Sequence, residues 1–400
     1  MAAPAARPDA MRRHNLSLIL GQVHRDGALT RADLTSRLGL SRSTIGALVS
    51  DLVELGLVEE SVPSGGTRAG RPSHVVGPHP RGPYVVAADV DVTHLTTAAV
   101  GLGGTMLARH VITIPSADRA TPDLIARLIL DSVPRLRELG NLGAAPVCIG
   151  VSVPGTVDRH NGTVGFAPNL GWRDSPFGAT LTELASPHLP VVVGNDADLA
   201  MLAEHIRGNA RGCDDAVFLI GRTGVGAGII VNGAPARGHD GHAGEIGHNV
   251  IDSSGPKCHC GKRGCLETYV GDSALLSLAG RRRRGNDDAT QVFRAAHDGQ
   301  FRSIEAVRTV AASLGRAIAG LVNMLNPERV LLGGSFADVL DAARSDVEAA
   351  LDNYVLDAPG ETVLLCKPGL GEDSALLGAA EVAFAELIAD PLRGRMLVAR

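Results

Sequence analysis

The sequence predicts an α/β protein in which a small helical domain ending in a hairpin precedes a larger body of two α/β lobes. Helical patterns and a glycine-rich turn occupy residues 1–77, whereas strand and helix patterns alternate from residue 84 onward. The 400 residues include 49 glycines but only 3% aromatic residues, so we expect many tight turns and cores of small aliphatic side chains. At about 100–200 residues per domain, this length predicts two to four domains.

Composition and charge exclude several classes of protein. A hydrophobic content of 44% excludes wholesale disorder. The sequence has no apolar run long enough to span a membrane and no secretory leader pattern at its start, so we expect a cytoplasmic protein. Residues 1–83 hold ten arginines and seven acidic residues, a net charge of +3, so a total charge of −5 leaves −8 on the remainder. A modestly basic head therefore precedes an acidic body.

The head begins with a helix, a short helix, a turn and a longer helix. The first helix ends at Gly27, and the second runs from a Thr30 cap to a break at Gly39. Ser41 caps the third helix, which ends at Gly56. The apolar faces of the first and third helices consist of Leu16, Ile19, Leu20, Val23, Ile45, Leu48, Val49, Leu52 and Leu55.

Residues 57–60 and 73–76 indicate the two strands of a hairpin around a glycine-rich tip. Three helices followed by such a hairpin predict a winged helix-turn-helix domain over residues 1–77. A three-helix protein-interaction module is the alternative, because helical patterns of this kind also occur in proteins that do not bind DNA.

The predicted DNA contacts lie on the third helix and on the hairpin tip. Arg42, Ser43 and Thr44 occupy the first turn of the third helix, where a recognition helix meets base edges and phosphates. Arg68 and Arg71 lie in the glycine-rich tip, which suits insertion into a narrow minor groove. Their positions favour DNA binding over protein interaction.

Residues 78–83, with three prolines and a glycine, predict a linker to a body that spans residues 84–400. A break near residues 194–200 divides this body into two similar lobes, and a cleft between two α/β lobes is a natural place for a small ligand. The strongest strand patterns cover residues 85–92, 98–102, 147–152, 191–194, 217–220, 228–231 and 329–332. The strongest helix patterns cover residues 123–139, 197–207 and 307–325.

Four side chains in the body have the types and number of a closed tetrahedral zinc site. Three of the six cysteines, Cys258, Cys260 and Cys265, lie within eight residues of one another, and His248 precedes them. Four protein ligands leave no open coordination position, so the sequence predicts one structural zinc ion per chain rather than a catalytic one. The alternative is three incidental thiols beside a core histidine.

Polar residues flank this cluster and follow one predicted strand. Glu245 stands three residues before His248, and Glu267 stands two residues after the last cysteine, so a metal would fix both carboxylates. Asn195 and Asp196 follow the strand at 191–194, at the sheet edge where ligands commonly bind. Paired carboxylates suit the vicinal hydroxyls of a polyol. A helix cap is the alternative role for the Asn-Asp pair.

Several motifs together resemble the ROK (repressor, open reading frame, kinase) family, and they extend over residues 84–385. They are Gly244-Glu245-Ile246-Gly247-His248, residues 258–267, Ser152-Val153-Pro154-Gly155, Ala167-Pro168-Asn169-Leu170-Gly171-Trp172, Val193-Gly194-Asn195-Asp196-Ala197 and Leu332-Gly333-Gly334-Ser335. The resemblance implies an actin/hexokinase-like (ribonuclease H-like) body, a homodimer or homotetramer, and a sugar or sugar-phosphate effector. It implies sugar contacts at Asn169, Asn195, Asp196, Glu245, His248 and Glu267, with Asp196 in the position of a kinase's base.

Departures from the family pattern distinguish a regulator from a kinase. The kinases of the family open the body with Asp-x-Gly-Gly-Thr, but here Asp91 and Val92 replace the two glycines that let backbone amides approach phosphate. Asp91 also puts a carboxylate where the phosphates of ATP would lie. Two like charges about 4 Å apart repel by on the order of 4 kcal/mol at an effective dielectric constant of about 20. In the second phosphate loop, residues 222–228, Arg222 replaces the usual first glycine. This change does not distinguish a regulator from a kinase, because an arginine would attract phosphate.

We therefore predict a sugar-controlled transcriptional regulator of carbohydrate metabolism genes, a repressor that binds a palindromic operator, and not an enzyme. The alternatives are an ATP-dependent sugar kinase of the ROK family and a purely structural zinc-bearing scaffold. A kinase consumes ATP in a sugar-dependent way, a regulator protects an operator, and a scaffold does neither.

Overall fold

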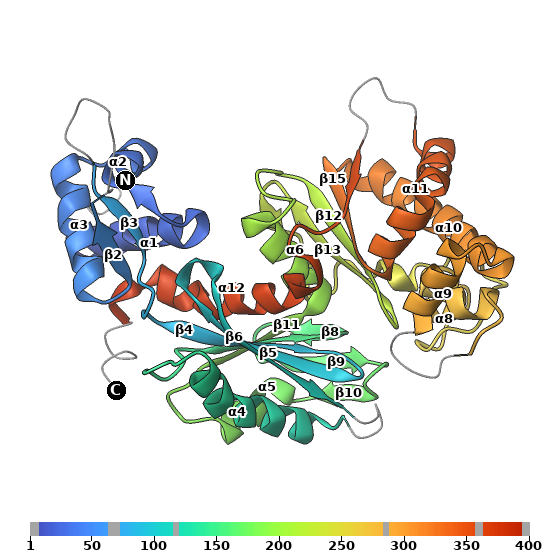
Figure 1. Cartoon of the computed structure of the whole chain (residues 1–400), viewed down its shortest axis with the longest axis horizontal. Helices are drawn as coiled ribbons and strands as arrows, with labels where there is room; N and C mark the ends of the chain where they lie inside the picture. The colour runs from blue at the N-terminus through green and yellow to red at the C-terminus, as the bar shows by residue number, and fades with distance from the viewer. Residues whose placement is uncertain (1–7, 63–72, 115–119, 283–287, 357–362, 394–400) are drawn as a thin grey trace, which may run out of the picture.

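The computed structural model describes residues 8–62, 73–114, 120–282, 288–356 and 363–393. A head, coloured blue in Figure 1, lies at one end of a body built on two five-stranded sheets. In the described part of the chain, no helix combines the length and the apolar composition needed to cross a bilayer.

The head has the three helices and the hairpin that the sequence predicts. Its elements are α1 (Pro8–Asp26), β1 (Leu29–Thr30), α2 (Arg31–Leu38), α3 (Arg42–Glu54), β2 (Val58–Ser61) and β3 (Val75–Pro78). Thr30 and Asp33 form a reciprocal capping box at α2, and the Ser41 side chain accepts the Thr44 N–H at α3. Gly39 ends α2 with a left-handed φ of 65°. The short strand β1 was not predicted; it pairs with β3 at the edge of the hairpin.

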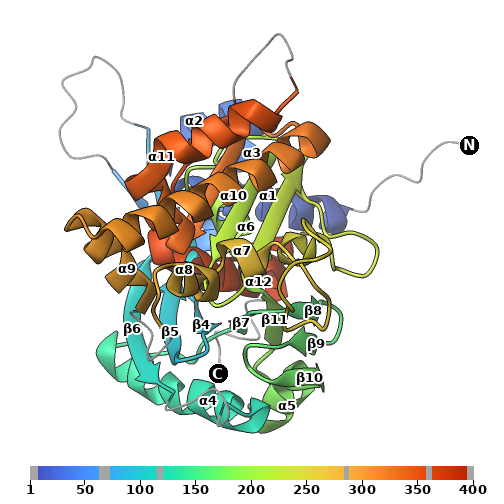
Figure 2. The same cartoon turned by 90° about the vertical axis from the view of Figure 1, so that its right-hand side faces the viewer.

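The first lobe is a five-stranded sheet with the strand order β11-β7-β4-β5-β6. Helices α4 and α5 cover one face, seen below the sheet in Figure 2, and a smaller sheet of β8, β9 and β10 adjoins it. Its elements are β4 (Tyr84–Val90), β5 (His94–Gly101), η1 (Leu102–Gly104), β6 (Met106–Thr113), α4 (Pro122–Leu139), β7 (Ile149–Val153), β8 (Thr156–Asp158), β9 (Thr163–Ala167), β10 (Trp172–Ser175), α5 (Phe177–Leu184) and β11 (Val191–Asn195). Strand β4 ends before Asp91 and Val92, which we expected within it.

The second lobe is a five-stranded sheet with the strand order β14-β13-β12-β15-β16. Helices α10 and α11 cover one face, and α6 packs on the other. Its elements are α6 (Asp196–Arg207), β12 (Ala216–Gly221), β13 (Val225–Val231), β14 (Ala234–Pro235), η3 (Ile246–His248), α7 (Glu267–Val270), α8 (Asp272–Leu278), α9 (Asp288–His297), α10 (Phe301–Leu325), β15 (Arg329–Gly334), α11 (Ser335–Tyr354), β16 (Leu364–Cys366) and η4 (Gly371–Asp373).

The last long helix, α12 (Ser374–Ala389), returns to the first lobe, where it packs on β4 and β7. The sequence predicts a division of the body into two lobes near residues 194–200, and this division did not indicate that a helix from the end of the chain returns to the first lobe. Helix α12 also packs along α6, so two helices lie between the two sheets. Contact with a sheet on one side and a helix on the other explains why α12 buries residues around most of its circumference.

The head contacts the body directly as well as through the linker, because α1 packs on α12 and on η1. Leu16, Leu20 and Val23 of α1 belong to the same hydrophobic core as Phe384 and Leu387 of α12. The head and the first lobe therefore share one core, and a change in the position of α12 reaches the head directly.

A buried polar network joins the head to the body beside this core. The His24 Nε2 and Glu381 Oε2 atoms are 2.9 Å apart, and the Arg207 Nε–H donates to Glu381 Oε1 at 2.6 Å. Arg207 also donates to the backbone carbonyls of His24 and Gly103, at 3.0 and 2.9 Å. The Gly103 N–H donates to His24 Nδ1 at 3.1 Å, and His24 Nε2 lies 2.8 Å from Arg207 Nη2 as well as beside Glu381. We call His24, Arg207 and Glu381 the junction triad.

Candidate functional site

The six predicted sugar contacts line one pocket where the two lobes meet. This pocket of about 80 Å³ lies at the carboxyl ends of β11 and β12, and we call it the lobe pocket. Its walls include Asn169, Asn195, Asp196, Glu245, His248 and Glu267. The fold thus brings together residues that lie up to 98 positions apart in the sequence.

Asn195 is the cap of α6, the alternative that the sequence left open for the Asn-Asp pair. Its side-chain oxygen accepts the Asp198 N–H at 3.0 Å. Its amide donates to the Gly155 carbonyl at 2.9 Å and to Asp196 Oδ1 at 3.1 Å. Because both amide hydrogens have partners, Asn195 is best suited to holding Asp196 in place.

Asp196 lines the lobe pocket, and its residue is only 8% exposed. Burial raises the pKa of this carboxyl to about 7, although the Arg222 guanidinium opposes the shift. The Asn195 amide and the Ala197 N–H both contact Oδ1, which leaves Oδ2 for a ligand hydroxyl. A carboxyl with such a pKa either accepts or donates a hydrogen bond near neutral pH.

Asn169 and Glu267 face each other across Gly224. A Cβ atom placed on Gly224 would lie 3.1 Å from Asn169 Nδ2 and 3.4 Å from Glu267 Oε2. The missing side chain therefore leaves space between an amide donor and a carboxylate. Glu245 also lines the pocket, with Oε2 at 3.9 Å from His248 Nε2, and burial raises the pKa of its carboxyl.

The predicted metal ligands converge beside the lobe pocket. One ligand atom each from His248, Cys258, Cys260 and Cys265 lies within 4.8 Å of the other three. The Cys258 Sγ and His248 Nδ1 atoms are 3.7 Å apart, and Cys260 Sγ and Cys265 Sγ are 3.6 Å apart. Tetrahedral zinc with bonds of about 2.0–2.3 Å places its ligand atoms about 3.5–3.8 Å apart, so both the donor set and its spacing suit zinc.

The metal cluster and the lobe pocket share two side chains. His248 turns Nδ1 toward Cys258 and Nε2 toward Glu245, so one imidazole serves both places. The Cys258 thiol donates to Glu267 Oε1 at 2.8 Å. Arrangement of the cluster therefore determines where two pocket side chains stand.

Arg222 and Asp91 also line the lobe pocket, in the region where the family's kinases have their phosphate loops. Arg222 Nη1 lies 3.5 Å from Asp89 Oδ2 and 3.8 Å from Asp91 Oδ2. The Ser152 hydroxyl donates to Asp89 Oδ1 at 2.6 Å. Arg222 was ambiguous from the sequence; the structure shows that it pairs with carboxylates of its own chain.

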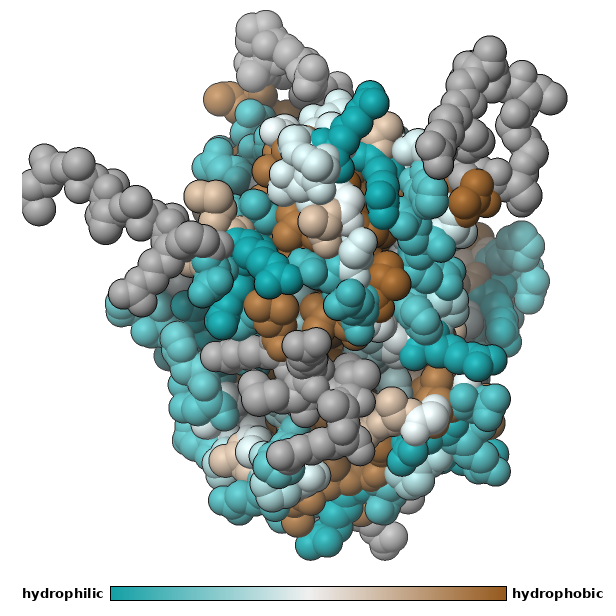
Figure 3. All heavy atoms as spheres, turned by 90° about the vertical axis from the view of Figure 1, so that its left-hand side faces the viewer, coloured by the Kyte–Doolittle hydropathy of each residue, from teal (hydrophilic) through white to brown (hydrophobic). Residues whose placement is uncertain are grey.

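The predicted recognition helix presents Arg42 and Ser43 to solvent on the first turn of α3. The Ser41 hydroxyl is 2.9 Å from Ser43 Oγ and 2.8 Å from Thr44 Oγ1, so the first turn is organised around this cap. Arg68 and Arg71 lie outside the described residues. On the side of the molecule that faces the viewer in Figure 3, the hydrophobic residues of the described surface form small groups among hydrophilic ones.

Two features of the site were missed by sequence reasoning. The ion pairs of Arg222 join residues more than 130 positions apart, and the junction triad joins residues more than 350 positions apart. His24 and Arg207 lie inside otherwise ordinary helices and Arg222 lies in a loop after β12, and no local pattern at these positions reveals such distant partners.

Comparison with known proteins identifies the body. Residues 85–386 match the ROK family over three quarters of the chain. The chain belongs to the ROK family. Residues 17–69 match the MarR family, in agreement with the winged helix architecture of the head.

Individual ROK relatives differ in how much of the chain they match. The Bacillus subtilis xylose repressor is 28% identical, over 92% of this chain and 94% of that repressor. The crystal structure of a ROK family transcriptional regulator, a homologue of the Escherichia coli MLC protein, has a TM-score of 0.78 at 25% identity and covers 96% of this chain and 99% of its own. A Halalkalibacterium halodurans glucokinase is 31% identical, over 74% of this chain and 93% of the enzyme.

The share of the chain that each relative matches shows whether that relative has the head, the body or both. The repressor and the transcriptional regulator match both head and body, whereas the glucokinase matches a length equal to the body alone. The chain combines a ROK body with a MarR-type winged helix, which is the domain arrangement of the regulators.

Proposed function

We propose that this chain is a DNA-binding transcriptional repressor of carbohydrate metabolism genes, controlled by a sugar or sugar phosphate in the lobe pocket. The observation that carries the proposal is the direct packing of a winged helix head on a ROK body, in which the six residues that the family resemblance implies as sugar contacts line one pocket. We assign DNA binding to residues 1–77, the connection to residues 78–83 and sugar binding to residues 84–400. As a DNA-binding regulator it would work in the cytoplasm.

Helix α6 supplies a physical route from the sugar to the DNA-binding head. It begins at Asp196 in the lobe pocket and ends at Arg207 in the junction triad, a length of about 18 Å at 1.5 Å per residue. A sugar that favours one arrangement of the lobes shifts α6, and with it the contact between Arg207 and α1. Equal affinity for both arrangements would shift nothing.

In a two-fold dimer the two copies of α3 would enter successive major grooves about 34–36 Å apart, so the operator would be palindromic. A modest movement of α1 relative to the body changes that spacing. We infer a homodimer or homotetramer on this ground, and size determination with and without a palindromic duplex measures it.

We expect Arg42→Ala to weaken operator binding by about 1–3 kcal/mol without unfolding the head, because Arg42 is exposed on the first turn of α3. Fluorescence anisotropy with an operator selected from random duplex DNA measures the change. Arg135→Ala, an exposed arginine on α4, is the matched control. Equal operator affinity of Arg42→Ala and wild type would remove this side chain from the interface.

We expect no sugar phosphorylation above background. Asp91 and Val92 replace both glycines of the first phosphate loop, and Arg222, which pairs with Asp91, replaces the first glycine of the second, although the candidate base Asp196 is present. Incubation with ATP and a panel of monosaccharides, followed by ADP detection, measures this. Turnover that disappears in Asp196→Asn would establish the kinase alternative.

The test of the proposed function is Glu267→Ala. The effector is first chosen as the monosaccharide or sugar phosphate that most stabilises the wild type in a thermal-shift screen, in which xylose is included because of the repressor relative. We expect the variant to bind the operator like wild type and to lose the response to that effector, because a carboxylate is missing from the pocket wall.

Two controls make this result specific. Zinc content measured on the same sample separates a lost sugar contact from a disturbed metal cluster, since Glu267 also touches Cys258. Asn169→Ala removes a pocket side chain from a different loop, between β9 and β10, and we expect the same loss of response. An effector response equal to wild type in both variants would contradict a sugar site here.

A further inference from the structure

A second cavity, separate from the lobe pocket, lies where the head and both lobes meet. Its volume is about 630 Å³, within the range of about 300–1,000 Å³ that is usual for small-molecule sites. Its walls come from α1, β11, α6, α12 and two loops that carry Arg159 and Arg237. We call it the junction cavity.

Most of the wall of the junction cavity is apolar. The side chains that supply it come from β11, α6 and α12 and include Val192, Leu199, Leu202, Ile206, Val382 and Ile388. Contact between this apolar surface and an aliphatic or aromatic part of a ligand removes both from water, which favours binding.

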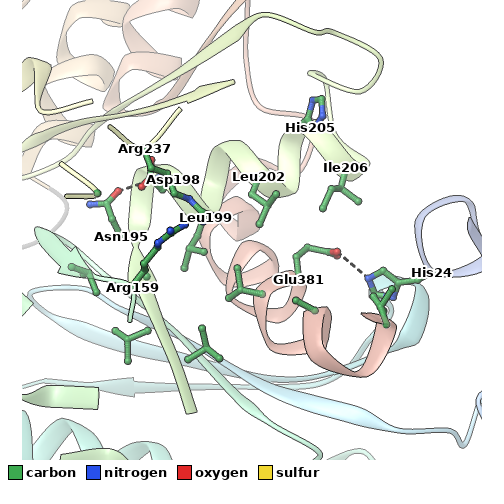
Figure 4. Close-up of a pocket in the computed structure, with 18 of the residues that line it drawn as sticks. His24, Arg159, Asn195, Asp198, Leu199, Leu202, His205, Ile206, Arg237 and Glu381 are labelled. Carbon is green, nitrogen blue, oxygen red and sulfur yellow. Dashed lines mark hydrogen bonds and ion pairs between the residues drawn. The ribbon is translucent and has the colours of Figure 1, made fainter. Parts of the chain in front are cut away.

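One end of the junction cavity carries two arginines from different lobes. Arg159 follows β8 of the first lobe and Arg237 follows β14 of the second, and in Figure 4 both side chains extend toward the end of the cavity near Asp198 and Leu199. Among the described residues, neither guanidinium has a hydrogen bond or an ion pair. Two unpaired guanidiniums aimed at one place match a carboxylate or a phosphate group.

Asp198 is the acidic side chain at this end, and it does not neutralise both arginines. Burial raises the pKa of Asp198 to about 6, although Arg237 opposes the shift. One carboxylate therefore faces two permanent positive charges, so the end of the cavity keeps an excess of positive charge for an anionic group.

The opposite end of the junction cavity reaches the head. Figure 4 shows His24 and Glu381 there, linked to each other, while Arg159 and Arg237 lie at the far end. Asn195 lines both the junction cavity and the lobe pocket. An occupant would thus lie between the lobe pocket and the junction triad and touch the head and both lobes at once.

We propose that the junction cavity is a second ligand site, which binds a small organic anion with an apolar body and holds the carboxylate or phosphate between Arg159 and Arg237. This assignment does not depend on the proposed repressor function, because it concerns ligand binding alone. A ligand that contacts three parts of the molecule favours whichever arrangement brings them together.

Isothermal titration of the full chain tests the site with octanoate, octyl phosphate and the neutral octanamide. We expect at least one of the two anions to bind about tenfold or more tightly than octanamide, and Arg159→Gln/Arg237→Gln to remove that preference. Binding of octanoate assigns the site to carboxylates, and binding of octyl phosphate alone assigns it to phosphates. Lack of saturable binding by both anions, or octanamide binding as tightly as they do, would overturn the proposal.

Two further variants locate the bound anion. Ala385→Trp places a large side chain into the cavity from the exposed face of α12 and should abolish anion binding. Arg135→Gln, on the distant α4, should bind the anion like wild type. Unchanged affinity in both Ala385→Trp and the double arginine variant would place the anion elsewhere and refute the site.

Discussion

Replacement of Cys260 by alanine is expected to remove the metal and, with it, the response to sugar. Apparent binding free energies of structural zinc reach about 10–16 kcal/mol in zinc-finger peptides at neutral pH, so the loss of one ligand affects the local fold strongly. His248 is one of the four ligands and also lines the lobe pocket, and Glu267 follows the ligand Cys265 by two residues, so both pocket side chains lose the support of the metal. Elemental analysis should find about one zinc per wild-type chain and none in the variant.

A matched cysteine outside the cluster controls for loss of a thiol. Cys366 lies on β16 in the second lobe, and Cys366→Ala should keep both the zinc and the effector response. Purified wild-type protein that contains no metal but still binds sugar would contradict the zinc assignment. Loss of metal without loss of sugar binding would show that the carboxylates are positioned by other contacts.

The sequence predicted the head well because its features are local. A capping box at Thr30 and a glycine at position 39 each depend on neighbours within a few residues, and both are present. The metal cluster was also predictable, since three of its four ligands lie within eight residues and the chemistry of cysteine and histidine is distinctive. The lobe pocket residues came from family motifs rather than from spacing.

Long-range packing was not predictable in the same way. Nothing in the apolar pattern of α12 indicated that this helix returns to the first lobe and shares a core with α1, because a helix buried on most sides has no distinctive amphipathic face. The junction cavity depends on the same packing. Its arginines are 78 positions apart, and only the assembled lobes bring them to one end of a cavity.

Replacement of Glu381 by glutamine is expected to destabilise the contact between the head and the body. The Glu381 and Arg207 side chains are only 4% and 12% exposed, so the variant leaves a largely buried guanidinium without its carboxylate. Breaking a buried pair in this way costs about 3–5 kcal/mol, which chemical denaturation measures. Glu183→Gln on α5, an exposed glutamate, is the matched control and should change stability little.

The pH dependence gives a second readout of the same residue. Burial raises the pKa of Glu381, but the hydrogen bond from His24 and the charge of Arg207 outweigh burial and hold it below 4.5. A carboxyl with a lowered pKa stabilises the fold above its ordinary pKa, and this contribution disappears as the pH falls through the lowered value. The wild type should therefore lose more stability than Glu381→Gln when the pH is taken below about 4.5.

A double replacement distinguishes the effect of the junction triad on protein stability from its effect on the response of operator binding to sugar. Arg207→Met/Glu381→Leu removes both charges and keeps side-chain volume, so it should recover part of the stability that Glu381→Gln loses. It should not recover the effect of sugar on operator affinity, because helix α6 then has no polar contact with His24 of the head. Operator affinity with and without effector, measured at a temperature where both proteins are folded, decides this. A full effector response in the double variant would show that the shared hydrophobic core, and not the junction triad, transmits the change to the DNA-binding helix.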